Sequence, residues 1–124
     1  MNNLAKMIAE GKITVEELAS AGKLIDRAKL VLEGINACKK TLVFPLGTSE
    51  IKCYEYTDSA GEYSAWGTCD SSGIFKCYCN WGGDHLIAEC DLNDFSSVFM
   101  AFENGDMDHN LRHFLKQQIE KAKK

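Results

Sequence analysis

The chain has 124 residues, of which 45% are hydrophobic and 26% are charged, and its formal net charge is −4. This is the length and balance of one ordinary globular domain, so it argues against both a disordered chain and a two-domain chain. The negative charge argues against direct nucleic-acid binding, because that function needs a basic surface facing the phosphates.

The N-terminal segment predicts a cytoplasmic protein. Lys6, Glu10 and Lys12 interrupt the apolar run that a secretory signal peptide needs. No apolar stretch approaches the length that spans a bilayer. We therefore expect no membrane partner and a compartment that keeps the six cysteines reduced.

Residues 1–40 are expected to be helical. A short amphipathic turn at 2–10 precedes a capping box formed by Thr14 and Glu17, and a long helix should run from about Val15 to Lys39. Its apolar residues step by three and four, so they form one stripe that suits a helix lying across a sheet. They are Leu18, Ala21, Ile25, Ala28, Leu32 and Ile35.

Residues 41–90 predict a five-stranded antiparallel meander. The first strand, Thr41–Leu46, is placed at the sheet edge because Pro45 cannot donate to a ladder. Turn sequences separate the four strands that follow. Those strands are expected at Ile51–Thr57, Glu62–Cys69, Ile74–Asn80 and Asp84–Cys90.

Centring each turn predicts the register of these strands. Cys53, Trp66 and Cys77 would lie in one row on a mostly apolar face, which holds four cysteines and packs against the long helix. The opposite face would carry all four tyrosines, and tyrosine is common at binding surfaces. The side chains expected there include Tyr54, Tyr56, Tyr63, Tyr78, Asn80 and His85.

Residues 91–124 predict two helices separated near Gly105. Asp91, Asn93 or Asp94 would cap the first, and Asp106 or Asp108 the second. One face of the last helix carries polar side chains three and four residues apart, namely His109, Arg112, His113 and Lys116. The expected fold is thus a single α+β domain, with a long N-terminal helix on the five-stranded meander and two C-terminal helices.

No catalytic motif selects a reaction, so we expect a protein that is not an enzyme and has no cofactor. A nucleophile elbow and both glycine-rich phosphate-binding motifs are absent. Cys77 and Cys79 form a C-x-C without the paired spacing of a zinc finger, which favours buried thiols and leaves a small structural zinc protein as one alternative. His109 and His113 lack the glutamate of a metalloprotease helix, and no metal ligand is assigned.

The tyrosine face and the last helix together hold the parts of a site for a nucleotide-like ligand. Aromatic rings stack on a base, and arginine binds phosphate oxygens in a fork. The two halves meet if the last helix, from this chain or a second protomer, lies beside the tyrosines. If the C-terminal helices simply bury the tyrosines, that face is a second core. The candidate residues are Tyr54, Tyr56, Tyr63, Tyr78, Asn80, His85, His109, Arg112, His113 and Lys116.

In outline, this small, acidic, motif-poor format resembles phage and mobile-element products that block bacterial immunity. The resemblance implies a protein that sequesters a nucleotide-derived immune signal in a pocket between protomers, or a binder of a bacterial effector protein. Exposed tyrosines and the long N-terminal helix favour a homo-oligomer. The second alternative is accordingly a protein-binding inhibitor or adaptor whose acidic surface imitates nucleic-acid phosphates. Its residues would be Glu16, Glu17, Asp58, Glu62, Asp70, Asp84, Asp91 and Asp94.

Overall fold

The computed structural model describes residues 15–124, with side chains from residue 21 onward. Its order of a helix, antiparallel strands and two further helices confirms the α+β class. The elements are α2 (Val15–Thr41), β1 (Glu50–Thr57), β2 (Ser64–Asp70), β3 (Ile74–Cys79), β4 (His85–Asp91), α3 (Phe95–Ala101) and α4 (Gly105–Ala122). The expected turn at 2–10 and Thr14 of the capping box lie outside the described residues.

The sheet has four strands, so the prediction of a fifth strand at Thr41–Leu46 was wrong. Thr41 ends α2, and the Leu42 N–H still bonds to the Cys38 carbonyl in the helical pattern. Pro45 offers no N–H for a ladder, and its carbonyl instead closes a turn by accepting from the Thr48 N–H. In this loop Leu42 and Phe44 pack against the core, whereas Val43 between them is exposed, so the apolar residues alternate without forming a strand.

The four strands form a meander in the order β1-β2-β3-β4, which leaves β1 and β4 as the edge strands. The predicted register between β2 and β3 was wrong by one residue, because Trp66 pairs with Tyr78 rather than Cys77. The connection between these strands is a three-residue loop ending at Gly73, whose φ is 95°. A left-handed third loop residue is typical of this hairpin and shifts the pairing relative to a symmetric turn.

Because of this shift, the side chains of β2 lie on the faces opposite to those predicted. A β-bulge at Cys53 has the same effect on the part of β1 that follows it. The buried face therefore includes Tyr54, Ala65 and Cys77, whereas Trp66 and Tyr78 lie on the opposite face. The prediction of four tyrosines on one face is corrected accordingly.

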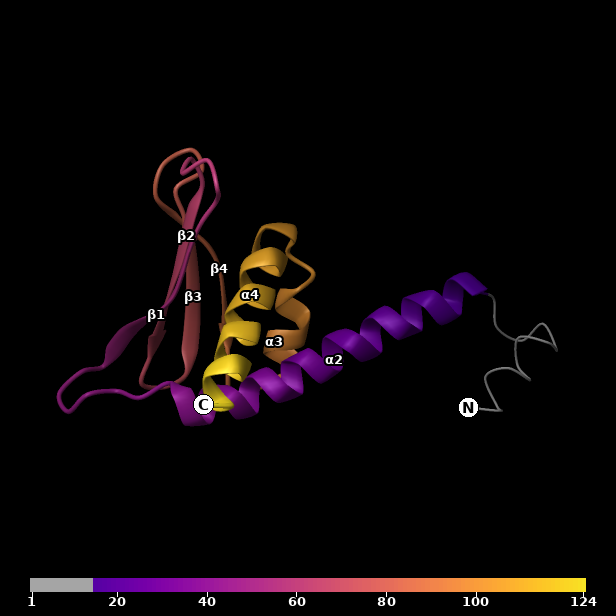
Figure 1. Cartoon of the computed structure of the whole chain (residues 1–124), viewed down its shortest axis with the longest axis horizontal. Helices are drawn as coiled ribbons and strands as arrows, with labels where there is room; N and C mark the ends of the chain where they lie inside the picture. The colour runs from indigo at the N-terminus through magenta and orange to yellow at the C-terminus, as the bar shows by residue number, and fades with distance from the viewer. Residues whose placement is uncertain (1–14) are drawn as a thin grey trace.

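The last helix, α4, covers the cysteine-bearing face of the sheet, where the N-terminal helix had been expected. The Phe114 ring of α4 stacks on Phe75 of β3 at a centroid distance of 4.2 Å. In turn, α2 packs along α4, with Gly34 so close that a Cβ there would lie 2.6 Å from the Leu115 Cδ2 atom. Figure 1 shows α4 beside the sheet and α2 extending past both. Leu111, Phe114 and Leu115 of α4 are fully buried.

Polar side chains cap both C-terminal helices. Asp94 caps α3, as one of the three predicted alternatives, because its Oδ1 accepts from the Ser96 N–H. For α4 the cap is Asn104, whose Oδ1 accepts from the Asp106 and Met107 N–H groups, so the prediction of Asp106 or Asp108 was wrong. Within residues 15–124, no helix has the length and hydropathy needed to cross a bilayer.

Candidate ligand-binding site

Three predicted site residues, Tyr56 of β1 and His109 and His113 of α4, lie against one another where α4 passes β1. The Tyr56 ring centroid is 5.1 Å from that of His109 and 5.3 Å from that of His113, both with edge-on geometry. The two imidazole centroids are 4.5 Å apart, as expected for residues four apart on a helix. The structure thus brings one tyrosine and the last helix together into what we call the aromatic cluster.

The aromatic cluster is bordered by positive charge. The pKa of His113 is lowered, chiefly because burial disfavours the imidazolium and further because His109 and Lys116 are nearby. Lys116 is exposed and follows His113 on the same side of α4. At neutral pH His113 therefore offers an uncharged ring, and Lys116 offers the charge.

Two shallow grooves continue from the cluster. The first has a volume of about 370 Å³ along the exposed side of α4, and the second has about 290 Å³ between α4 and β1. Gln117 and Lys121 line both grooves, so they form one surface, which we call the β1–α4 groove. Its lining residues are Lys52, Cys53, Tyr54, Glu55, His113, Lys116, Gln117, Glu120 and Lys121.

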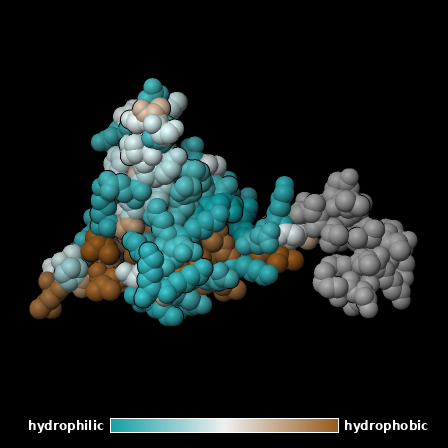
Figure 2. All heavy atoms as spheres, viewed as in Figure 1, coloured by the Kyte–Doolittle hydropathy of each residue, from teal (hydrophilic) through white to brown (hydrophobic). Residues whose placement is uncertain are grey.

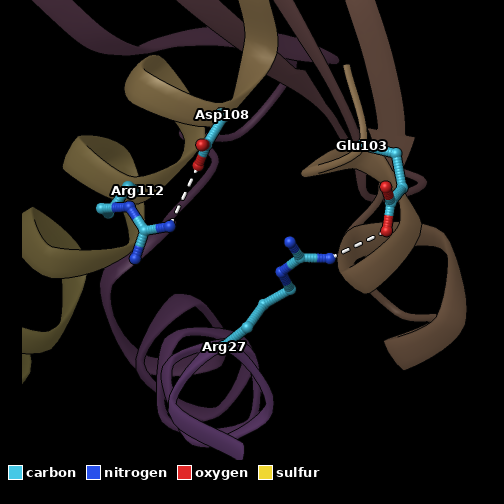
Figure 3. Close-up of polar contacts among 4 residues, drawn as sticks. All are labelled: Arg27, Glu103, Asp108 and Arg112. Atoms are coloured by element: carbon cyan, nitrogen blue, oxygen red, sulfur yellow. Dashed lines mark hydrogen bonds and ion pairs between the residues drawn. The ribbon is translucent and has the colours of Figure 1, made fainter. Parts of the chain in front are cut away.

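Arg112 points away from the aromatic cluster. Its Nη2 atom donates to the Asp108 Oδ1 at 3.1 Å, and its guanidinium lies 5.3 Å from the centre of the Phe102 ring. Figure 3 shows Arg112 directed toward Asp108, with Arg27 of α2 nearby and bonded to Glu103. Arg112 is therefore engaged in the packing between helices instead of lying beside Tyr56.

Tyr54 and Tyr63 lie on the α4 side of the sheet but are tied into the interior. Tyr54 is only 2% exposed, and its hydroxyl donates to the Asn110 Oδ1 at 2.9 Å. The Asn110 Nδ2 donates to the Tyr63 hydroxyl oxygen at 3.1 Å and to the Asp106 carbonyl. Burial raises the pKa of both phenols. Tyr54 therefore belongs to the same core as Phe75 and Cys77, and its ring is not part of a binding surface.

Tyr78 lies on the face of the sheet that α4 does not cover. Its ring stacks on Trp66 of the neighbouring strand, with a centroid distance of 5.8 Å and an interplanar angle of 11°. Leu86 of β4 is paired with Tyr78 and is exposed. Tyr78 is therefore separated from the aromatic cluster by the sheet itself.

Asn80 and His85 lie at the turn between β3 and β4. The Asn80 Oδ1 accepts from the Ser64 N–H, and its Nδ2 donates to the Glu62 carbonyl, so Asn80 holds two loops together. The His85 Nδ1 is 2.8 Å from the Gly83 carbonyl oxygen, and its Nε2 is 3.7 Å from the Cys79 sulfur. Neither residue contributes to the β1–α4 groove.

The cysteines are free, and five of them are buried. Among the described residues, no three His, Cys, Asp or Glu side chains are grouped so that they could hold a metal ion. The zinc alternative stays a prediction. The acidic-surface alternative stays a prediction, although several of its carboxylates already accept backbone N–H groups in turns and caps. These are Asp58, Asp70, Asp91 and Asp94.

Sequence reasoning missed Asn110 and assigned Trp66 to the wrong face of the sheet. Asn110 lies three residues after Met107 and four before Phe114, so helical spacing already placed it on the buried side of α4. No comparable local signal existed for Trp66, because its face depends on the loop that sets the register.

Comparison of the chain with protein-family models, with curated proteins and with solved structures finds no match. The geometry of the chain is therefore the evidence on which its function is argued.

Proposed function

We propose that this protein is a non-catalytic binding protein that sequesters a nucleotide-derived signalling molecule in the β1–α4 groove. The observation that carries the proposal is the aromatic cluster of Tyr56, His109 and His113 at one end of a lysine-lined groove. Sequestration of such a signal is the role that the outline resemblance to phage and mobile-element products implies.

The chemistry of the groove matches the two parts of a nucleotide. A base has an apolar face that stacks on tyrosine or neutral imidazole rings. Phosphates need positive charge a few ångströms away, and Lys116 and Lys121 lie along the groove beyond His113. Lys52 is paired with Glu55 at 2.9 Å and is available only if that pair opens.

A thermal-shift and calorimetric screen tests the proposal. The panel contains ATP, ADP, ADP-ribose, cyclic ADP-ribose isomers and cyclic dinucleotides, with inorganic phosphate as a charge-only control. We expect at least one nucleotide to raise the melting temperature. Lys116→Ala should weaken its binding about 10- to 150-fold, since a charge-assisted contact contributes about 1.5–3 kcal/mol.

The matched control is Lys76→Ala, which removes a lysine from the opposite face of the sheet. Binding should be unchanged by this variant. A flat screen across the panel refutes the proposed function, and loss of binding in Lys76→Ala but not Lys116→Ala would move the site to the sheet face.

We further propose that the partner of α2 is a second copy of this chain. Among the side chains of α2 that the structure describes, residues 21–41, three large apolar ones stay in solvent, with Leu24 47%, Ile25 54% and Leu32 54% exposed. Two of them belong to the stripe of three-and-four spacing, the pattern by which helices pair. Figure 2 shows hydrophobic residues along the part of α2 that extends beyond the body.

The charges of α2 favour an antiparallel pair. In the sequence this helix begins with Glu16 and Glu17 and ends with Lys39 and Lys40. An antiparallel neighbour places acidic ends beside basic ends, and it also opposes the two helix dipoles. The arrangement is two-fold symmetric, as most homodimers are.

Native mass spectrometry and light scattering test this pairing. We expect a dimer that Ile25→Glu converts to a monomer, because the carboxylate would be buried in the contact. Val43→Glu adds the same charge at an exposed apolar loop residue and should leave the dimer intact. A monomeric wild-type chain at micromolar concentration would contradict the proposal.

A further inference from the structure

Cys79 and His85 form a close pair at the ends of two neighbouring strands. They are partners in the register of β3 and β4, and the Cys79 sulfur lies 3.7 Å from the His85 Nε2. Both Gly82 and Gly83 in the connecting turn have positive φ, which allows the chain to reverse tightly enough to bring the two side chains together. A thiol and an imidazole at this distance make the nucleophile–base arrangement of an activated cysteine.

The hydrogen bond on the other side of the ring defines the tautomer of His85. The Nδ1 atom lies 2.8 Å from the Gly83 carbonyl oxygen, which can only accept a hydrogen bond. Nδ1 of the neutral ring therefore carries the hydrogen, and the lone pair is on Nε2. That lone pair faces the Cys79 sulfur, so it is placed to take the thiol proton.

The pair lines a cavity through which a small molecule can reach the sulfur. The cavity has a volume of about 200 Å³ and is also lined by Tyr63, Trp81 and Asp106. Cys79 as a whole is only 5% exposed, and its contact with solvent is through this cavity.

The other cysteines lie in surroundings that keep them protonated. Burial raises the pKa of the Cys38, Cys77 and Cys90 thiols to about 12 and that of Cys69 to about 11. It raises the pKa of Cys53 as well. Since the thiolate is the nucleophile, these five thiols react slowly at neutral pH.

We propose that Cys79, with His85 as its base, is the reactive thiol of this chain and forms a mixed disulfide with small disulfides such as oxidised glutathione. His85 Nε2 takes the proton, and the thiolate attacks one sulfur of the disulfide. A new S–S bond forms to Cys79 while the original S–S bond breaks, and the released glutathione thiolate takes up a proton. The reaction is stoichiometric and independent of the β1–α4 groove.

Alkylation kinetics test the activation by His85. The folded protein is treated with limiting iodoacetamide, in which the S–C bond forms as iodide leaves, and each cysteine is quantified by peptide mass spectrometry. Cys79 should be the first labelled. His85→Gln should slow its labelling by at least about tenfold, because the amide cannot take the proton. Asp84→Ala, at the neighbouring exposed residue, should label at the wild-type rate.

Oxidised glutathione tests the adduct itself. Intact-mass analysis should show one glutathione per chain, absent from Cys79→Ser and reversed by dithiothreitol. Faster labelling of the half-exposed Cys53, an unchanged rate in His85→Gln, or failure to form the adduct on Cys79 would each overturn the proposal. None of these outcomes depends on nucleotide binding, so the two proposals fail separately.

Discussion

Replacement of Tyr54 distinguishes a core tyrosine from a binding-surface tyrosine. Tyr54→Phe keeps the ring against Phe114 but removes the hydroxyl that donates to Asn110. The Asn110 carbonyl oxygen then stays buried without this donor, while its amide keeps its own bonds to Tyr63 and Asp106. An unpaired buried acceptor costs about 1–3 kcal/mol, so we expect a loss of about 1–2 kcal/mol.

The loss is measured by urea unfolding and by the melting temperature. For a domain of this size, 1 kcal/mol lowers the melting temperature by roughly 4 °C. Tyr54→Ala removes the whole ring as well and should cost about 3–5 kcal/mol. Tyr78→Phe is the matched control on the open face and should change stability by less than about 0.5 kcal/mol.

The reasoning is refuted if Tyr54→Phe unfolds like the wild type within about 0.3 kcal/mol. In that case the contact with Asn110 contributes nothing, and Tyr54 is free to serve a ligand. Equal effects of the two Tyr→Phe changes would contradict the assignment of faces.

Three further predictions concern packing, capping and pH. Gly34→Ala should destabilise the chain by about 1–3 kcal/mol in urea unfolding, because its Cβ would overlap Leu115 at the contact of α2 with α4. Asn104→Ala should lower stability by about 1 kcal/mol and reduce helical circular dichroism, since two α4 N–H groups lose their acceptor. Asn36→Ala, at an exposed position within α2, is the control. Stability measured under reducing conditions should fall as pH rises above about 9. Cysteines then ionise in the unfolded chain, whereas burial holds the folded thiols, such as Cys77, near a pKa of 12. Unchanged stability between pH 8 and about 11 would contradict this prediction.

Helices, strands and turns followed from local patterns in the sequence. The strands at residues 50–91 lie within two residues of their predicted ends, because turn chemistry at Gly61, Gly73 and Gly82 marks each reversal. The buried side of α4 could be recognised from side chains spaced three and four residues apart. Alternating residues at 41–46 misled the prediction because a loop laid on a core shows the same period as a strand.

The assignment of side chains to faces was decided only by the tertiary structure. A three-residue loop at Gly73 and a bulge at Cys53 each change the pairing by one residue, and one residue reverses a strand's faces. Whether α2 or α4 covers the sheet also depends on contacts between distant segments. The sequence by itself determined the long helix, the four strands at residues 50–91 and the two C-terminal helices. Long-range packing decided that Tyr54 is core, Tyr78 is on the open face and Tyr56 meets the histidines of α4.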